Sequence, residues 1–310
     1  MSGYKYLFGP VPSRRLGASL GVSPIPERTC NYSCVYCQLG RTLRMTNTRQ
    51  EFFPLEEILT EFREYLRGSI PFDVVTVVGE GEPTLYSRLG ELIAGLKKET
   101  DKPVAVITNG ALLYDAEMRR ELMEADIVLP SLDAVTEEQY RKIDRPMGSI
   151  GFAEMAEGLR QFAREYQGQL WIEIMLVDGM NDSPEDIAAF KEFLGTIDYD
   201  RVYLNTPVRP PAEGFVHTSA PERIDLAARE LGGISIDQLT SGSFFSEVED
   251  PYEAILSIAR RHPMNQFEVE SFLEAREIPA DQRQALMERL GQDPGITVVP
   301  YKGIITYRVN

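Results

Sequence analysis

Several residue types are scarce in this chain. It holds two histidines, one tryptophan and three cysteines among 310 residues. Two histidines leave little room for acid–base chemistry built on imidazole, so we interpret His217 and His262 as surface or core-edge residues. Three cysteines cannot supply the several disulfide pairs that a small disulfide-dense fold needs. The composition therefore excludes a disulfide-stabilised scaffold and disfavours a histidine-based catalytic dyad.

Long uncharged runs are also missing. The longest stretches without a charged residue are 29–40 and 103–114, each twelve residues long. A membrane-spanning helix needs about 20 apolar residues, so none is expected. The first ten residues, MSGYKYLFGP, lack the basic segment, apolar run and small-residue cleavage site of a secretory signal. The sequence therefore predicts a cytoplasmic protein without membrane contact.

The charge is distributed unevenly along the chain. The formal net charge is −16, yet residues 1–50 hold seven basic residues against one acidic residue, a net of +6. A strongly acidic protein is a poor non-specific binder of nucleic acid, because each phosphate contact needs a cation. Residues 1–50 are therefore either a local basic face or ordinary solvated charge.

Short apolar runs alternate with segments of helical period over the first two thirds of the chain. Apolar residues at helical spacing follow the runs, as in Leu55, Leu59, Phe62 and Leu66. Repetition of strand and helix indicates a parallel α/β sheet, either open or curled toward a barrel. The six expected strands are 18–22, 74–78, 104–108, 127–132, 170–177 and 202–205.

The alternation ends at the proline-rich segment 205–214, NTPVRPPAEG. Its three prolines restrict the backbone and exclude a helix. We therefore expect an α/β domain over 1–210, a linker with a connecting helix over 211–249, and a small C-terminal domain over 250–310. Three short helical patterns followed by a hairpin indicate that this last domain is winged-helix-like.

The expected C-terminal domain has an unfavourable charge for binding duplex DNA. Residues 247–310 include seven basic and eleven acidic residues, a net of −4. Its third helical pattern places Arg283 and Arg289 near Asp281 and Glu288, so no basic helix face results. Duplex DNA binding is not expected. A peptide or protein partner, or packing of the domain as a lid on the barrel, fits its charge better.

All three cysteines, Cys30, Cys34 and Cys37, fall within the segment TCNYSCVYCQLG. A clustered, odd number of cysteines in a cytosolic chain indicates metal or redox chemistry rather than disulfides. Thiolates at this spacing can converge on one iron–sulfur cluster, and three of them leave one iron of a cubane without a protein ligand. The alternatives are a Cys3His zinc site completed by His217 or His262, and three unrelated thiols.

The CxxxCxxC spacing, with Tyr36 directly before the last cysteine, resembles the cluster motif of radical S-adenosylmethionine (SAM) enzymes. The resemblance implies a partial (β/α)6 TIM-like barrel with a [4Fe-4S] cluster bound by Cys30, Cys34 and Cys37. It also implies that SAM binds the cluster and is cleaved reductively to a 5′-deoxyadenosyl radical. The electron would come from a donor such as a flavodoxin or ferredoxin.

A second motif lies at the end of the next expected strand, in VVGEGEPTL. Gly81, Glu82 and Pro83 resemble the Gly-Glu motif that contacts the SAM amino group in this family. Taken alone, this motif is equally an ordinary turn. By the same resemblance, polar residues after later strands are expected to contact the SAM ribose or carboxylate, or else to be plain loop residues: Asn109, Ser131 and Asp133.

Other polar residues are expected near the mouth of the barrel. Glu173 alternates with apolar neighbours in an expected strand, where a carboxylate needs a polar cavity, so it is a candidate cofactor ligand inside the barrel. Arginines beside the cysteine loop or after the sixth strand are candidate partners of an anionic substrate or of the SAM carboxylate, or ordinary surface charge: Arg14, Arg15, Arg41 and Arg209.

One group within the superfamily resembles this chain most. FGPVPSRRLG at 8–17, the cysteine segment, GEGEPTL and NTPVRPP are similar to Fe-S oxidoreductases related to wyosine-tRNA synthases. Wyosine synthases carry additional upstream cysteines for a second cluster, and this chain has none before Cys30. The resemblance therefore implies radical initiation without implying the same tRNA product.

Three functions compete at this point. The first is a radical SAM enzyme that abstracts hydrogen from RNA or another anionic substrate drawn to residues 1–50. The second is an activating or peptide- or protein-modifying radical SAM enzyme whose C-terminal domain grips a partner. The third is a non-catalytic zinc-binding scaffold. The agreement of cysteine spacing, Gly-Glu motif and strand–helix repetition favours an enzyme.

Overall fold

The computed structural model describes residues 4–13, 15–68, 70–236, 244–246, 248–301 and 303–310. Within these residues the main sheet has eight strands in the order β1-β2-β5-β6-β7-β8-β9-β10. β1 is antiparallel to β2, and the remaining neighbours are parallel. The strands are β1 (Leu7–Ser13), β2 (Gly17–Val22), β5 (Val74–Val77), β6 (Val104–Thr108), β7 (Ile127–Pro130), β8 (Gln169–Met175), β9 (Arg201–Asn205) and β10 (Ile234–Ser235).

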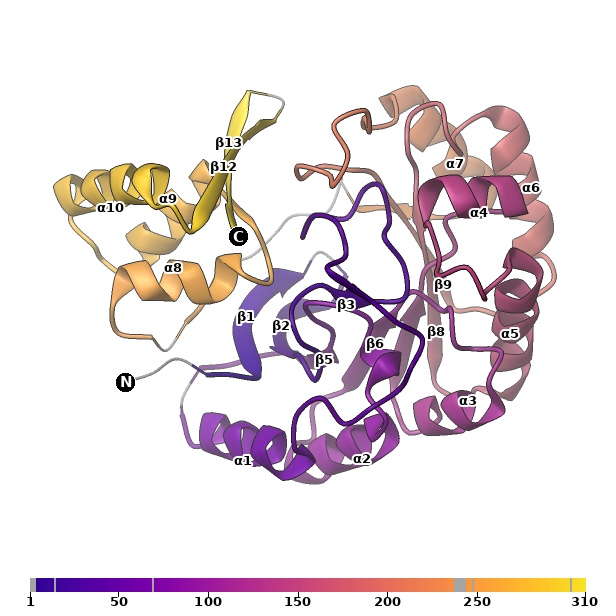
Figure 1. The fold of residues 1–310 in the computed structure, drawn as a ribbon, viewed down its shortest axis with the longest axis horizontal. Helices are drawn as coiled ribbons and strands as arrows, with labels where there is room; N and C mark the ends of the chain where they lie inside the picture. Colours follow the sequence, from indigo (N-terminus) through magenta and orange to yellow (C-terminus); the bar gives the residue numbers. More distant parts are fainter. Residues whose placement is uncertain (1–3, 14, 69, 237–243, 247, 302) are drawn as a thin grey trace.

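Helices surround the outer face of this sheet, which curls as part of a barrel (Figure 1). The curl resolves the choice between an open sheet and a barrel, and the predicted α/β partial barrel is confirmed. In the described part of the chain, no helix is long and apolar enough to cross a membrane. The helices are α1 (Leu55–Leu66), α2 (Leu89–Glu99), α3 (Ala116–Leu122), α4 (Glu137–Ile143), α5 (Phe152–Glu165), α6 (Pro184–Leu194) and α7 (Pro221–Leu231).

Local sequence explains where two of these helices begin. At α6, the Ser183 hydroxyl accepts a hydrogen bond from the Asp186 amide at 3.1 Å, and the Asp186 carboxylate accepts one from the Ser183 amide at 3.1 Å. This reciprocal pair is a capping box, and Pro184 supplies a favoured first helical residue. At α4, Thr136 accepts a hydrogen bond from the Gln139 amide at 3.2 Å. Each of these helix starts therefore has one of its free backbone amides satisfied by a capping side chain.

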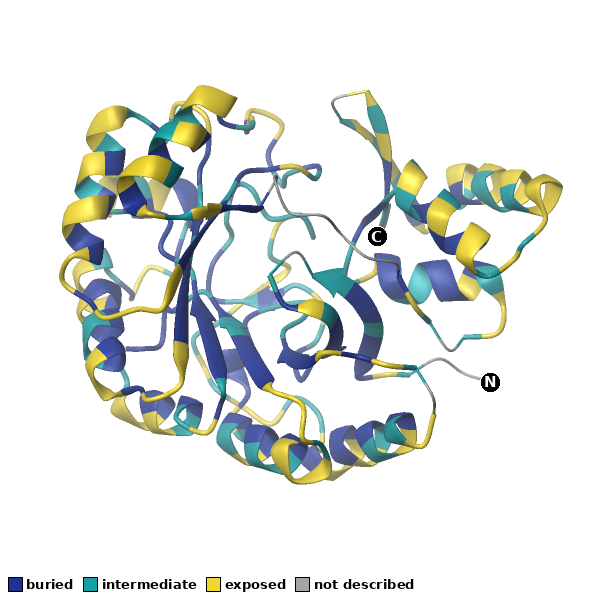
Figure 2. Cartoon of the chain, turned by 180° about the vertical axis from the view of Figure 1, so that it is seen from behind, coloured by how far each residue is buried: buried dark blue, intermediate teal, exposed yellow. Residues whose placement is uncertain are grey.

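The two faces of the curled sheet have different chemistry. Outward residues such as Val75 and Ile172 join the helices in one large apolar core. Figure 2 shows the sheet buried and the outer helix faces exposed. Inward residues near the amino ends of the strands, such as Val74 and Trp171, form a smaller apolar plug. Toward the carboxyl ends of the strands the interior contains the polar residues Ser19, Thr76 and Glu173. A polar interior at this end is typical of barrels whose active sites lie there.

A second unit follows the barrel in the chain. It has its own apolar core, which also includes Phe8 and Val11 of β1. Its three helices and hairpin agree with the predicted elements, while the winged-helix class and the domain boundaries stay predictions. Its short sheet is antiparallel, in the order β11-β13-β12. The elements are α8 (Pro251–Ala259), β11 (Met264–Asn265), α9 (Gln266–Ala275), α10 (Ala280–Gln292), β12 (Ile296–Tyr301) and β13 (Ile304–Val309).

Polar contacts join this C-terminal unit to two parts of the barrel. On the β1 side (Figure 1), Arg261 donates to the Lys5 carbonyl at 2.7 Å and lies 3.6 Å from the Glu80 carboxylate. After β9, the Tyr301 hydroxyl of β12 donates to the Pro207 carbonyl at 2.9 Å. The unit therefore packs beside the barrel, with attachments at both the first strand and the loop after β9, while its role as a lid or as a partner-binding module stays a prediction.

Arg209 makes the most extensive of these attachments. Its guanidinium donates to both carboxylate oxygens of Glu268 on α9, at 2.9 and 3.0 Å, and also to the Pro263 carbonyl. The same group lies 2.6 Å from His262 Nε2. A bidentate arginine–carboxylate pair fixes geometry as well as charge. In this structure Arg209 therefore contacts the C-terminal unit, and His262 lies at the core edge, as expected.

Removing this contact should loosen the C-terminal unit. Charge-assisted hydrogen bonds contribute about 1.5–3 kcal/mol each to stability, so Arg209→Ala should speed amide hydrogen exchange in α9 by about tenfold or more. Arg229→Ala is the matched control, because Arg229 is 69% exposed and has only a 3.9 Å contact with Glu230. Equal α9 exchange in both variants would show that Arg209 does not hold the unit in place.

Candidate active site

The three cysteines lie on one loop above the carboxyl ends of the strands. Cys30 ends the short strand β3 (Thr29–Cys30), and Cys34 and Cys37 follow in the loop. All three are half-buried free thiols. Burial raises the pKa of each thiol, and charge on the neighbouring cysteines raises the pKa of Cys30 and Cys34 further. The loop therefore gathers three thiols that interact electrostatically.

Packing against α4 holds this loop in place. The Val35 amide donates to the Ile143 carbonyl at 2.9 Å, and the Val35 side chain packs against Ile143, Val177 and Val216. The hydroxyls of Tyr32 and Tyr140 lie 2.5 Å apart. The cysteine positions thus depend on the barrel core rather than on the loop alone.

The Gly-Glu turn after β5 touches the start of the cysteine loop. A Cβ at Gly81 would lie 1.8 Å from the Thr29 carbonyl oxygen, so the approach requires glycine. The next amide, of Glu82, donates to that same carbonyl at 3.1 Å. The turn and the loop therefore share a backbone contact that any side chain at Gly81 would disrupt.

The Glu82 carboxylate is engaged by donors of this chain. It is buried and accepts hydrogen bonds from the Thr84 amide and hydroxyl at 3.0 and 2.6 Å. It also accepts hydrogen bonds from the Thr108 hydroxyl at 2.6 Å and from the backbone amide of Asn109 at 2.8 Å. Burial raises the pKa of Glu82, and these hydrogen bonds oppose the rise. Glu82 therefore ties the turn after β5 to the end of β6.

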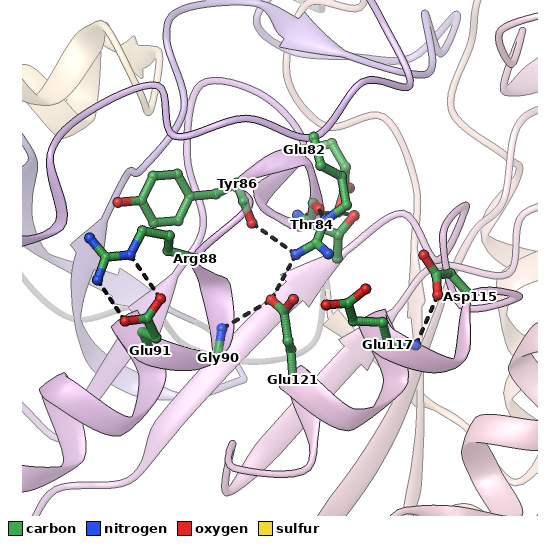
Figure 3. Close-up of polar contacts among 10 residues, drawn as sticks. Glu82, Thr84, Tyr86, Arg88, Gly90, Glu91, Asp115, Glu117 and Glu121 are labelled. Carbon is green, nitrogen blue, oxygen red and sulfur yellow. Dashed lines mark hydrogen bonds and ion pairs between the residues drawn. The ribbon is translucent and has the colours of Figure 1, made fainter.

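Arg49 anchors the other side of the same turn. Its guanidinium donates to the carbonyls of Thr84 and Tyr86 at 3.0 and 3.1 Å, and to the Glu121 carboxylate at 2.7 Å. Figure 3 shows Glu82 and Thr84 on the turn above Glu121, which also accepts from the Gly90 amide at 3.1 Å. Sequence reasoning missed Arg49, because its partners lie in two distant segments, the turn at 84–86 and α3. The buried Pro83 begins the short helix of this turn.

Asn109 connects the end of β6 to the first cysteine. Its side-chain nitrogen, Nδ2, lies 3.6 Å from Cys30 Sγ and donates a hydrogen bond to Asn31 Oδ1 at 2.7 Å. In the described part of the chain, the buried Asn31 Nδ2 has no hydrogen-bond partner. A buried donor without an acceptor is costly, and one beside Cys30 fits a site that a further group completes. The three cysteine thiols and the side-chain amide of Asn31 therefore suit a thiolate-bound cofactor.

Two carboxylates lie on the opposite side of the loop. The Tyr36 hydroxyl donates to Asp133, whose other oxygen accepts from the Met175 amide at 2.7 Å. Asp144 Oδ1 lies 3.8 Å from Cys34 Sγ. Burial raises the pKa of both carboxyl groups. Asp144 was missed from the sequence, because nothing near it in the chain marks it as a neighbour of Cys34.

Glu173 lies inside the barrel, as expected, but it already has partners. It forms an ion pair with Arg15 and accepts from Asn205 Nδ2 at 3.1 Å. Ser131, which directly follows β7, pairs with Glu173 of β8 in a parallel β-bridge. Burial lowers the pKa of Arg15 to about 10. Glu173 is therefore charge-compensated by its own chain, while Arg14 lies outside the described residues.

Many basic residues of 1–50 form ion pairs with acidic residues of the chain. Arg41 and Glu213 make a bidentate pair at 2.9 Å, and Arg145 joins Glu213 at 2.6 Å. Five of the seven basic residues have such partners, which weakens the case for a basic face that attracts RNA. The pairs are Lys5–Glu57, Arg15–Glu173, Arg28–Glu27, Arg41–Glu213 and Arg49–Glu121.

The geometry gives no support to the zinc alternative. Among the described residues, no three His, Cys, Asp or Glu side chains are placed to hold one metal ion. A single tetrahedral zinc would need all its ligands within about 2.3 Å of one point. His217 is exposed, and His262 contacts Arg209. Neither histidine therefore completes a Cys3His site.

A cavity of about 940 Å³ lies between the segment after β9 and the C-terminal hairpin. The buried hydroxyl of Ser219 lines it without a hydrogen-bond partner among the described residues. Val216, also in its wall, packs against Val35 of the cysteine loop. The volume lies in the range of small-molecule sites. Further wall residues are Pro210, Pro211, His217, Ile224, Val299 and Tyr301.

Comparison with known families agrees with this geometry. The family model of the radical SAM superfamily matches residues 25–191. This chain belongs to the radical SAM superfamily and is an enzyme. Its cofactors are those of the superfamily, a [4Fe-4S] cluster and SAM, and the superfamily generally takes electrons from flavodoxin or ferredoxin.

Particular relatives are recognisable over different parts of the chain. A UPF0026 protein of Methanocaldococcus jannaschii is 32% identical over 314 residues, covering 98% of this chain and 95% of that protein. A protein named GTPase Obg from Brachyspira hyodysenteriae is 43% identical over 205 residues, which are 66% of this chain and 30% of that protein. This chain therefore spans less than a third of the second relative.

Solved structures share the fold. A radical SAM methyltransferase from Sphaerobacter thermophilus matches with a TM-score of 0.52 and 18% identity, covering 71% of this chain and 67% of that chain. The structural neighbours include TYW1 with a lysine-pyruvate adduct bound, at a TM-score of 0.46 and 17% identity over 94% of this chain and 80% of that chain. At these identities the likeness concerns the fold alone.

The contact at Gly81 yields a direct test. Gly81→Ala should push the turn off Thr29 and lower the free energy of unfolding by at least about 3 kcal/mol, because backbone atoms cannot yield as side chains do. Gly148→Ala is the control, since a Cβ there meets nothing within 4 Å. Chemical denaturation measures both. A Gly81 variant as stable as the control would contradict the close contact.

Proposed function

We propose that Cys30, Cys34 and Cys37 hold the [4Fe-4S] cluster and that the enzyme abstracts hydrogen from a substrate bound under the C-terminal unit. When bound, cluster and SAM supply a 5′-deoxyadenosyl radical by reductive cleavage of SAM. The observation that carries the proposal is the gathering of three half-buried thiols on one packed loop, beside the unpartnered amide of Asn31. The loop supplies three ligands and leaves one cluster position open.

The residues around the loop divide into contact and positioning roles. Asn109 and Ser131 are proposed to contact SAM, since they lie at strand ends beside the loop, and Tyr36 is proposed to do so from within the loop. The carboxylates of Glu82 and Asp133 are proposed as positioning groups, because donors of this chain occupy their oxygens. Any contact of the Gly-Glu turn with the SAM amino group would then come chiefly from its backbone.

The cavity beside the hairpin supports a substrate, or part of one, of small-molecule size. Its volume of about 940 Å³ would admit a nucleotide-sized group. The pairing of Arg15 and Arg41 with acidic residues leaves less positive charge for a long RNA. A small substrate is therefore favoured over RNA, and the described part of the cavity wall, which includes Asp225 and neither lysine nor arginine, gives no preference for an anion. The packing of the C-terminal unit on the barrel supports a lid more than a surface that grips a protein.

Loss of one cysteine should abolish both cofactor assembly and SAM cleavage. After anaerobic reconstitution and chemical reduction, the wild type should form 5′-deoxyadenosine, detected by mass spectrometry, and Cys34→Ala should form none. Gln38→Ala is the control, because Gln38 lies in the same loop and has no sulfur. A Cys34 variant that retains full iron content would contradict the ligand assignment. Stimulation of 5′-deoxyadenosine formation by RNA or protein fractions alone would contradict a small substrate.

Glu82→Gln tests the positioning role. The added amide group would meet the donors of Thr108 and Asn109, so the ends of β5 and β6 should separate. We expect SAM affinity to fall about tenfold or more while iron content is kept. Calorimetric titration of SAM into the iron-loaded protein measures this change. Unchanged affinity would remove Glu82 from any role in SAM binding.

A further inference from the structure

A cation of the C-terminal unit reaches the cysteine loop. Arg308 lies on β13. Its Nη1 lies 3.6 Å from the point that a Cβ would occupy at Gly40, and Gly40 is three residues after Cys37. Arg28, at the start of the loop, brings its own Nη1 to 3.7 Å from the same point. Two guanidinium groups from distant parts of the chain therefore meet beside Gly40.

The charge of Arg308 has no matching partner in the chain as described. Its Nη1 is buried and makes no hydrogen bond within the described ranges. Burial lowers the pKa of Arg308, the nearby Arg28 lowers it further, and Cys37 opposes the change. Arg28 already has Glu27 as an ion-pair partner at 3.1 Å, so the buried Nη1 of Arg308 is the group that lacks an acceptor, and such a group is unfavourable without an anion beside it. Negative charge near Cys37 would therefore stabilise the Arg308 guanidinium.

Gly40 is hydrogen-bonded to the third cysteine, because its amide donates to the Cys37 carbonyl at 3.1 Å. Burial raises the pKa of Cys37, but the backbone amides of Leu39 and Gly40 and the two arginines oppose the rise. The position that the two guanidinium groups flank is therefore one turn from Cys37, a proposed cluster ligand. Hydrogen bonds and charges near ligand sulfurs are among the features that set the reduction potential of an iron–sulfur cluster.

We propose that Arg308, together with Arg28, acts on the cluster through Cys37 and raises its midpoint potential. The inference rests on the proposed function, since it takes Cys37 as a ligand. Reduction adds one electron from the external donor to a cluster that is already anionic with three thiolate ligands. A nearby cation stabilises the reduced state more than the oxidised state, so it favours reduction. Arg308 is then a positioning residue supplied by the C-terminal unit.

This arrangement couples the C-terminal unit to electron acceptance. Arg308 reaches the loop only while β13 lies beside the barrel, and β13 belongs to the hairpin that also borders the cavity through Tyr301. Movement of the hairpin away from the loop would remove one cation from the cluster environment. The cluster would then be harder to reduce when the unit is displaced.

The test is a redox titration of the iron-loaded, SAM-free full chain, followed by electron paramagnetic resonance. Arg308→Gln should shift the midpoint potential to a more negative value. We expect the ratio of reduced to oxidised cluster at a fixed potential to fall about tenfold, which corresponds to about 59 mV for a one-electron couple. Arg308→Lys keeps the charge and should recover most of the shift. Arg289→Gln removes the same charge from α10, where Arg289 is stacked on Tyr252, and should leave the midpoint unchanged.

The outcomes separate the inference from the function beneath it. Failure of the wild type to bind iron, or to give a cluster signal, would overturn the proposed function. Equal iron content with equal midpoints in wild type and Arg308→Gln would overturn the inference alone. A shift of the same size in Arg289→Gln would also overturn it, because net charge rather than proximity would then explain the change. Iron content and far-ultraviolet circular dichroism confirm that each variant is folded and loaded.

Discussion

The close approach of the Gly81 turn to the Thr29 carbonyl is the contact on which the site depends. It sets the distance between the end of β5 and the start of the cysteine loop. Glu82 then continues the connection to β6, and Asn109 returns it to Cys30. Three successive segments are thus joined by short polar contacts, so the thiols lie on a rigid framework although they occupy a loop.

Electrostatic compensation shapes the rest of the molecule. The acidic majority of the chain supplies carboxylates such as Glu173 and Glu213 to arginines near the barrel mouth. Arg209 uses Glu268 in the same way to hold α9. Against this background of paired charge, Arg308 lies beside another cation, Arg28, and its buried Nη1 has no hydrogen-bond partner among the residues described, as is also true of Arg15 Nη1 and Arg261 Nε.

The sequence predicted the fold class and the cysteine loop, because both depend on local patterns: apolar periodicity in one case and fixed thiol spacing in the other. It predicted that Glu173 faces a polar interior for the same reason. It could not predict that Arg15 neutralises Glu173, that Asp144 lies beside Cys34, or that Arg308 reaches the loop. Those contacts join distant segments, and single-sequence patterns carry no information on which segments meet.

The packing of the C-terminal unit on β1 has a consequence for solubility. An open sheet ends in strands whose free edges can pair with another molecule and start aggregation. On β1, Pro10 and Pro12 lack the amide hydrogens that such pairing needs. The Phe245 amide already donates to the Pro10 carbonyl at 3.0 Å. At these positions the first edge of the sheet is therefore blocked against intermolecular strand addition.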